Sequence, residues 1–324
     1  MRVKVFYHDK CFDGACSAAL FARFYQERIR EDVEFVFHGL LHRAGALFDE
    51  ADFTGDENAI VDFKYSSSPQ ITWWFDHHES AFLTPGDAEH FEQDQSNRKF
   101  YDPSFRSCTK FLATVAEQRF GFNPAPVSEV IEWADIIDGA LYPNATSAVE
   151  MREPAMKLTM VIETAQDPSF VPKLIALLAT RSLASILEEP FVAPLMPPLL
   201  ERHQRSIGIL RERTEFKDGT IFFDVTDQEL EGYNKFIPYY LHPTSIYSVG
   251  LSKSSFRTKV SVGSNPWSQD ERMVNLARIC ERYGGGGHAR VGAISFDVTQ
   301  EEAARQAARD IVEELRVSVR NNGT

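Results

Sequence analysis

The sequence predicts an α/β protein in two parts: an N-terminal parallel sheet with helices on both faces, and a smaller C-terminal α+β domain. Two observations support this prediction. Over residues 1–138, short continuous apolar runs alternate with segments whose apolar residues recur at helical spacing, which is typical of crossovers in a parallel sheet. From Thr220 onward, short strand patterns are mixed with helical ones. A chain of 324 residues is also long enough for two domains.

The elements of the first part follow from the apolar periodicity. The predicted strands are residues 3–7, 33–37, 59–63 and 71–76. The predicted helices are residues 15–28, 44–49, 108–120 and 127–138. Ser104 or Ser107 is the expected cap of the third helix. Residues 85–98 are predicted to form a polar loop.

A proline cluster at residues 194–198 marks the expected boundary between domains. We therefore predict an N-terminal domain over residues 1–195, a linker helix over 196–216 and a C-terminal domain over 217–324. The strands predicted in the C-terminal domain are residues 221–225, 246–251, 259–263 and 291–296. The helices predicted there are residues 271–283 and 301–317.

Composition excludes several classes of function. The net charge of −13 argues against tight binding of long duplex nucleic acid, which requires a broad basic surface. No apolar run approaches the length of a membrane span, so no membrane partner is expected. The first residues lead directly into a strand pattern without a signal peptide, which predicts a cytoplasmic location. Four scattered cysteines indicate neither a disulfide framework nor a zinc ribbon.

Acidic residues and histidines follow three of the predicted strands. They are His8, Asp9 and Asp13 after the first strand, Asp62 within a later one, and Asp76, His77 and His78 at the end of the next. Carboxyl ends of neighbouring parallel strands meet at one edge, where ligands bind. Gathered carboxylates repel one another unless a cation neutralises them. This donor set suits Mn²⁺ or a similar divalent ion. The alternative is that Asp13 and Asp76 merely cap helices.

These residues stand in motifs that resemble those of the DHH phosphoesterases. The Asp-His-His triplet that names the family is Asp76-His77-His78, and its first motif is similar to His8…Asp13-Gly14. Its second motif is a strand-end Asp, here Asp62, and its fourth is an Asp on a later helix, here Asp135 or Asp138. Gly285-Gly286-Gly287-His288 matches the glycine–histidine motif of the C-terminal DHH-associated domain. The chain is similar to oligoribonuclease and nucleotide phosphodiesterase members.

The resemblance implies a centre of two divalent ions with Mn²⁺ preferred and Mg²⁺ or Co²⁺ as alternatives. It assigns one ion to Asp13, Asp62, His77 and the later Asp, for which we prefer Asp135 to Asp138. It assigns the second ion to His8 and Asp62.

One position departs from the family pattern. The family often carries a further Asp where this chain has Cys11. Three readings of this departure stay open: Asp9 replaces the missing ligand, Cys11 binds the ion as a thiolate, or Cys11 is a small buried loop residue.

Two bound ions would activate a water for in-line attack on phosphorus. His78 and Asp76 are the predicted catalytic residues. Because successive side chains of an extended backbone point in opposite directions, His78 is expected to differ in role from His77. It would contact the phosphate, protonate the leaving oxygen, or orient a ligand.

The predicted substrate-binding residues lie in the C-terminal domain. They are Gly285, Gly286, Gly287, His288, Arg257 and Arg290. Glycine N–H groups could hold a terminal phosphate, although the glycines could equally form a plain turn. The leading hypothesis is a metal-dependent phosphodiesterase of short oligonucleotides or small nucleotides. The alternatives are a phosphoanhydride hydrolase acting on polyphosphate or pyrophosphate, and a nucleotide-binding module that has lost catalysis. A homodimer is a further expectation.

Overall fold

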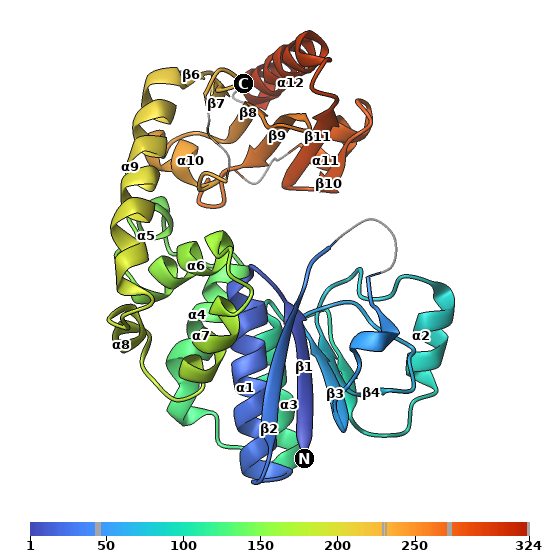
Figure 1. The fold of residues 1–324 in the computed structure, drawn as a ribbon. Coiled ribbons are helices and arrows are strands. Elements are labelled where there is room, and N and C mark those ends of the chain that lie inside the picture. The colour runs from blue at the N-terminus through green and yellow to red at the C-terminus, as the bar shows by residue number, and fades with distance from the viewer. Residues whose placement is uncertain (43–46, 229, 231, 271–273, 323–324) are drawn as a thin grey trace. The chain divides into compact units, whose positions relative to one another are not determined.

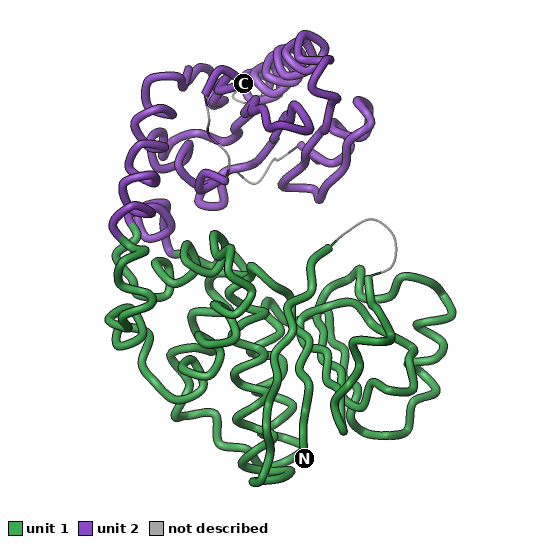
Figure 2. The backbone as a smooth tube through the Cα atoms, in the orientation of Figure 1, with its two compact units in different colours: residues 1–142, 151–196 green, residues 143–150, 197–324 purple. Residues whose placement is uncertain are grey.

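The computed structural model describes residues 1–42, 47–228, 230, 232–270 and 274–322 (Figure 1). The chain divides into two compact units (Figure 2). The first comprises residues 1–142 and 151–196, and the second residues 143–150 and 197–324. The domain limits expected from the sequence stay a prediction. Among the described helices, none combines the length and the apolar character that crossing a bilayer requires.

The first unit is built on a five-stranded, fully parallel sheet in the order β2-β1-β3-β4-β5. Its strands are β1 (Arg2–His8), β2 (Glu34–Leu40), β3 (Glu57–Val61), β4 (Ile71–Asp76) and β5 (Lys99–Tyr101). Four of them were predicted, and β5 was not, since its three residues are too few for a periodicity to show. The register pairs Tyr7 with Val61 and Val61 with Phe75. The residues that follow Tyr7, Val61 and Phe75 therefore lie side by side at the carboxyl edge of the sheet.

Helices cover both faces of this sheet, as predicted. On one face, Phe21 and Phe24 of α1 (Phe12–Arg28) pack against Trp73 at ring distances of 6.0 and 5.9 Å. On the other face, Phe91 of α2 (Pro85–Glu92) packs beside Trp74. The alternating strand side chains thus supply two apolar faces, and the α/β fold class is confirmed.

The expectation of a loop over residues 85–98 was wrong for its first half. Thr84 and Asp87 form a reciprocal capping box, and Pro85 occupies the first turn of α2. These signals begin a helix even where its polar composition hides the periodicity. The helix predicted near residues 44–49 lies partly on residues 43–46, outside the described residues, and the described residues 47–49 are not helical.

The other helices of the first unit pack against the sheet or against the helices that cover it. They are α3 (Cys108–Phe120), α4 (Ser128–Asp138), α6 (Pro154–Thr164), α7 (Phe170–Leu178) and α8 (Leu183–Leu187), with short 3₁₀ turns at Glu50–Asp52, Ala125–Val127 and Ala193–Leu195. Ser107, one of the two expected caps, accepts a hydrogen bond from the N–H of Lys110 at the start of α3.

The second unit contains a six-stranded mixed sheet in the order β10-β11-β9-β8-β7-β6. Its strands are β6 (Glu215–Lys217), β7 (Thr220–Asp224), β8 (Tyr247–Lys253), β9 (Thr258–Ser264), β10 (Gly286–His288) and β11 (Val291–Phe296). Its helices are α5 (Ala145–Val149), α9 (Met196–Arg213), α10 (Ile237–Leu241), α11 (Leu276–Glu281) and α12 (Glu301–Asn322). Side chains of α11 and α12 form a core with β8, β9 and β11. Of the helix predicted over 271–283, residues 271–273 lie outside the described residues.

Candidate metal centre

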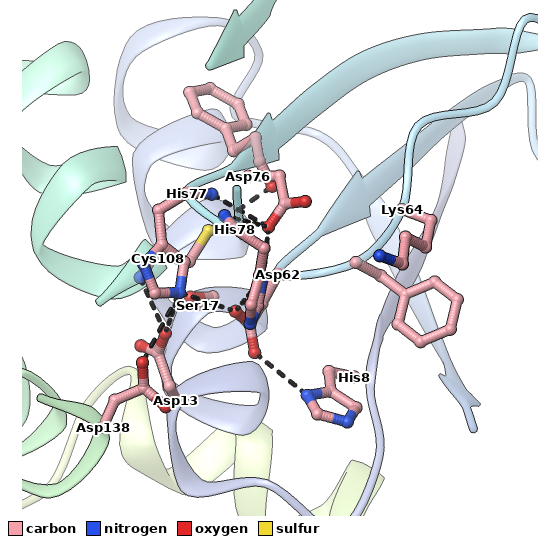
Figure 3. Close-up of polar contacts among 12 residues, drawn as sticks. His8, Asp13, Ser17, Asp62, Lys64, Asp76, His77, His78, Cys108 and Asp138 are labelled. Atoms are coloured by element: carbon pink, nitrogen blue, oxygen red, sulfur yellow. Dashed lines mark hydrogen bonds and ion pairs between the residues drawn. The ribbon is translucent and has the colours of Figure 1, made fainter. Parts of the chain in front are cut away.

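The carboxyl edge of the parallel sheet gathers most of the acidic and histidine side chains that the sequence singles out (Figure 3). His8 ends β1, Asp62 follows β3 directly, and Asp76 ends β4. Because these strands are neighbours in parallel register, their next side chains converge at this edge. The nearest atoms of His8 and Asp62 are 3.5 Å apart, and those of His77 and Asp62 are also 3.5 Å apart.

Asp13 reaches the cluster because Gly14 lets α1 approach the end of β1. A Cβ atom at Gly14 would lie 2.1 Å from the carbonyl oxygen of His8. Only glycine fits this contact. The two residues of the Asp13-Gly14 pair therefore act together. Gly14 allows α1 to approach the end of β1, and this approach brings the Asp13 carboxylate to the site.

Asp13 is fixed in place by the N-terminus of α3. Its side chain is fully buried and accepts hydrogen bonds from the N–H groups of Cys108, at 2.7 Å, and Thr109, at 3.0 Å. The Thr109 hydroxyl donates a third at 2.6 Å. A helix N-terminus favours a negative charge through its free N–H groups and its dipole. These partners could not be predicted from the sequence, apart from the cap expected at Ser107.

Asp62 occupies the centre of the cluster. Its φ angle of +57° is in the left-handed region, which costs a residue other than glycine about 1 kcal/mol. The turn directs the carboxylate toward three imidazoles: His8, His77 and, at 4.0 Å, His78. Such strain persists only where the surrounding structure holds it, and it clusters at functional sites.

His77 is oriented as a ligand would be. Its Nδ1 lies 3.2 Å from the carbonyl oxygen of Phe105, which can only accept, so Nδ1 carries the proton of that hydrogen bond. Its Nε2 faces Asp62 and Asp138 at 3.5 Å each and Asp13 at 3.8 Å. The lone pair of the neutral ring would therefore point into the acidic cluster.

Several buried polar atoms of the cluster are unsatisfied. Both carboxylate oxygens of Asp62, Oδ2 of Asp76 and Nε2 of His77 have no hydrogen-bond partner among the described residues. Such atoms are costly unless something else binds them. Around an ion with bonds of about 2.1 Å, neighbouring ligand atoms lie roughly 3.0–3.5 Å apart. The 3.5 Å separations at Asp62 fit that spacing, so these residues fit a divalent metal ion.

Among the described residues, three groups of side chains have the compactness of a metal site. They are Asp13, His77 and Asp138; His8, Cys11 and Asp62; and Asp62, His77 and His78. The first two describe two adjacent ion positions, because Asp62 of the second group also contacts His77 of the first. In the third group, the His78 atom that faces Asp62 is Nδ1, at 4.0 Å, and this same atom lies 2.7 Å from Asp76, whereas His77 turns its Nε2 toward the cluster.

The electrostatics show the expected crowding of charge. Burial and the neighbouring Asp62 raise the pKa of Asp13 well above its ordinary value, and the same causes raise the pKa of Asp138 to about 6. Burial alone would raise the pKa of Asp62, but contacts with His77 and His8 lower it well below its ordinary value. Burial likewise opposes charge on His77, yet Asp62 and Asp13 raise its pKa to about 10. A bound cation would replace the proton on His77.

Metal binding should therefore release protons. His77 must be neutral to ligate, but without metal it stays protonated until the pH approaches its pKa of about 10. The apparent affinity for Mn²⁺ should rise as the pH rises through the neutral range, with roughly one proton released per ion at this position. Calorimetric titration at pH 7 in buffers of different ionisation enthalpy measures that number. Equal heats in all buffers would contradict the assignment of His77.

The structure brings Asp138 rather than Asp135 to the cluster, which reverses the preference made from the sequence. Asp135 instead accepts hydrogen bonds from Lys110, at 2.6 Å, and Ser107, at 3.3 Å. Both acids share one face of α4, so their spacing could not separate them. The difference arises because Lys110 and Ser107 of the neighbouring helix α3 already neutralise Asp135.

Asp9 lies near the cluster but outside its metal-binding groups. Its carboxylate accepts a hydrogen bond from the N–H of Lys10, and it packs against Gly39 of β2. Among the described residues, Cys11 and not Asp9 joins His8 and Asp62 in a compact group.

His78 and Asp76 form a hydrogen-bonded pair beside the cluster. Nδ1 of His78 lies 2.7 Å from Oδ1 of Asp76, and that oxygen also accepts from the N–H of His77 at 2.8 Å. Asp76 is fully buried, whereas the His78 side chain is 38% exposed. Burial opposes charge on His78, but the contact with Asp76 raises its pKa. Asp76 is thus placed to position His78, which alone of the two reaches solvent.

The sequence suggested that the side chains of His77 and His78 point in opposite directions. In the structure, the two rings instead lie beside each other. Their centroids are 4.4 Å apart. The strand β4 ends at Asp76, so the alternation of an extended strand does not continue through residues 77 and 78.

In the second unit, the glycine–histidine motif forms the edge strand β10. It pairs antiparallel with β11, with Gly287 opposite Gly292 and His288 opposite Val291. His288 and Arg290 are exposed around the turn between these strands. The motif is therefore a regular strand and turn rather than an open loop.

Arg257 lies away from this motif. It precedes β9, whose first residue pairs with Phe296, while His288 pairs with the opposite end of β11. About five residues of strand separate them, which is roughly 17 Å. Arg257 instead donates a hydrogen bond to Ser295. The prediction that Arg257 shares one phosphate pocket with His288 and Arg290 was therefore wrong.

Substitution of the motif's glycines should have unequal effects on stability. A Cβ atom at Gly287 would lie 2.2 Å from the carbonyl oxygen of Val291, and its φ is +153°, whereas at Gly286 nothing lies within 4 Å. Gly287→Ala should lower the free energy of unfolding by about 1–3 kcal/mol. Gly286→Ala is the matched control and should change it by a few tenths. Urea unfolding measures both, and equal midpoints would contradict a packing role for Gly287.

The fold is that of the DHH family, to which several similar solved structures belong. The pGpG-specific phosphodiesterase PggH from Vibrio cholerae has a TM-score of 0.65 at 19% identity, with 99% of each chain covered. An exopolyphosphatase-related protein from Bacteroides fragilis has a TM-score of 0.52 at 15% identity, covering 99% of this chain and 94% of that one. RecJ from Thermus thermophilus, in complex with Mn²⁺, has a TM-score of 0.54 at 14% identity, covering 97% of this chain and 52% of that one.

Sequence comparison alone finds no such relation. No protein-family model matches the chain, and no curated protein does. The predicted resemblance is confirmed by the fold.

Proposed function

We propose that this protein is a metal-dependent phosphoesterase that hydrolyses short oligonucleotides or small nucleotides. The observation that carries the proposal is Asp62, buried and strained, with both carboxylate oxygens unsatisfied and imidazoles on either side. Such a residue is suited to bridging two ions. Mn²⁺ is the proposed ion, with Mg²⁺ and Co²⁺ as alternatives.

The proposed ligands are divided between two positions. Asp13, His77 and Asp138 would hold one ion and His8 the other, with Asp62 shared. When bound, such ions supply a nucleophile at neutral pH and stabilise charge on the phosphate oxygens. Asp135 is left out of this assignment because Lys110 neutralises it.

The remaining steps belong to the protein's own side chains. His78, exposed and held by Asp76, would donate a proton to the leaving oxygen. The contact with Asp76 raises the pKa of His78, which favours the protonated ring that a general acid requires. The surface around His288 and Arg290 would bind a terminal phosphate, although Arg257 is too distant to join it.

A nucleotide is favoured over polyphosphate by one feature of the second unit. The Phe256 side chain is 68% exposed, and the Arg257 guanidinium lies 5.2 Å from its ring centre. An exposed aromatic ring offers a base a stacking surface, for which a polyphosphate chain has no use. Because Phe256 adjoins Arg257, a base on this ring would belong to a nucleotide unit other than the one whose phosphate contacts His288. The similarity in fold to a pGpG-specific phosphodiesterase supports the same choice. A homodimer and a cytoplasmic location stay predictions.

The proposal is tested with the full chain, stripped of metal by chelation and resupplied with Mn²⁺. Dinucleotides with a 5′-phosphate, longer oligoribonucleotides and polyphosphate are compared by chromatography of the products. We expect mononucleotide release that requires the added ion. Folded, Mn²⁺-loaded protein that cleaves none of these compounds would overturn the proposal in favour of a binding module. Preferred cleavage of polyphosphate would favour the phosphoanhydride alternative.

His288→Ala should chiefly weaken substrate binding. The side chain is exposed on an edge strand of the second unit, where it can contact substrate but holds no structure in place. We expect KM to rise about tenfold for a 5′-phosphorylated dinucleotide with kcat little changed. The same substrate without its 5′-phosphate is the control and should show a smaller change. Unchanged kinetics with both substrates would remove His288 from the binding surface.

A further inference from the structure

We propose that Cys11 is a sulfur ligand in the ion position formed with His8 and Asp62, and that this position prefers a thiophilic divalent ion such as Zn²⁺ or Co²⁺. The inference rests on the proposed function, since it specifies one of the two ion positions of that hydrolase. It predicts a centre whose two positions differ in chemistry.

The geometry of three donors supports this assignment. Nδ1 of His8, Sγ of Cys11 and a carboxylate oxygen of Asp62 all lie within 4.8 Å of one another. Cys11 precedes α1 with extended backbone, and its side chain makes no capping hydrogen bond. The sulfur is therefore not occupied by the helix terminus that it adjoins.

An independent observation points to a ligand at this place. Asp62 is 1% exposed, and neither of its oxygens accepts a hydrogen bond from any described residue. Oδ2 faces His8 at 3.5 Å and Oδ1 faces His77 at 3.5 Å. One oxygen is thus directed to each ion position, and the one beside His8 shares its position with the sulfur.

The two donor sets differ in softness. Asp13, His77 and Asp138 provide two carboxylates and one imidazole, which suit Mn²⁺. His8, Cys11 and Asp62 provide one sulfur, one imidazole and one carboxylate. Thiolate ligands select Zn²⁺ and similar ions over Mg²⁺ and Mn²⁺. The chain therefore favours one hard ion and one softer ion side by side.

Cobalt spectroscopy tests this inference without any turnover. The full metal-free chain is titrated anaerobically with Co²⁺, and the sulfur-to-cobalt charge-transfer absorption in the near ultraviolet is recorded. We expect this band in the wild type and its loss in Cys11→Ser and Cys11→Asp. Both replacements are favourable helix caps, so α1 should stay folded. Cys280→Ala is the matched control: it removes a buried thiol from the second unit and should keep the band.

Competition binding gives a second readout. Cys11→Ser should weaken Zn²⁺ binding roughly tenfold or more, and Cys11→Asp should restore binding while shifting preference toward Mn²⁺. Two bound Co²⁺ ions without the charge-transfer band would overturn this inference and leave the hydrolase proposal standing. A band without hydrolysis of any tested substrate would do the reverse. No bound Co²⁺ at all would overturn both.

Discussion

Asp62→Asn should lower kcat by about 10³-fold or more. Asp62 contributes to both ion positions, and its two oxygens face His8 and His77 separately. An amide keeps the shape of the side chain but removes its charge and replaces one oxygen with an NH₂ group, which repels a cation. We expect the variant to lose most of its metal as well as its activity. Steady-state kinetics and metal content by mass spectrometry measure the two losses.

Asp9→Asn is the matched control for this experiment. Asp9 follows the same sheet edge, but its carboxylate is used by the N–H of Lys10 and lies outside the described metal-binding groups. Its replacement should leave both the ion content and kcat within about twofold of the wild type. The assignment of the centre fails if Asp62→Asn retains full activity, or if both variants lose activity equally.

Asp76→Asn should lower kcat by about 10²–10⁴-fold without removing the metal. Asp76 touches no ion position directly; it holds His78 through a 2.7 Å contact with Nδ1. An amide oxygen can still accept that hydrogen bond, but it no longer stabilises the imidazolium. His78 would then lose its proton at lower pH and fail as a proton donor.

The pH profile separates this role from a structural one. A general acid works below its own pKa, and the contact with Asp76 raises the pKa of His78. The alkaline limb of kcat should therefore lie at lower pH in Asp76→Asn than in the wild type. His78→Ala should abolish that limb. An unchanged limb in Asp76→Asn, with kcat reduced, would make Asp76 a purely structural residue.

Convergence at the sheet edge could be predicted from the sequence because it follows from strand order alone. Once β1, β3 and β4 are parallel neighbours, His8, Asp62 and Asp76 must meet. The choice between Asp135 and Asp138 could not be predicted, because it depends on which acid meets Lys110 of another helix. The backbone donors to Asp13 could not be predicted either. Every sequence supplies N–H groups, and only the fold determines which of them point at a given carboxylate.

In the second unit, the sequence identified residues of suitable type but could not predict the register of the strands that carry them. Arg257 and His288 have suitable chemistry for a phosphate, but the pairing of β9, β11 and β10 places them at opposite ends of strand β11. A spacing along the chain does not reveal such separation. The short strand β5 and the polar helix α2 were missed for a related reason: both depend on caps and neighbours more than on periodicity.

The anchoring of Asp13 has a consequence for how the protein would respond to metal supply. Its carboxylate is held by main-chain groups of α3, and His77 is held by the carbonyl of Phe105. Neither orientation depends on an ion. Loading and unloading should therefore be quick and reversible, with no refolding step in between, and the protein could exchange one ion for another as their cellular concentrations change.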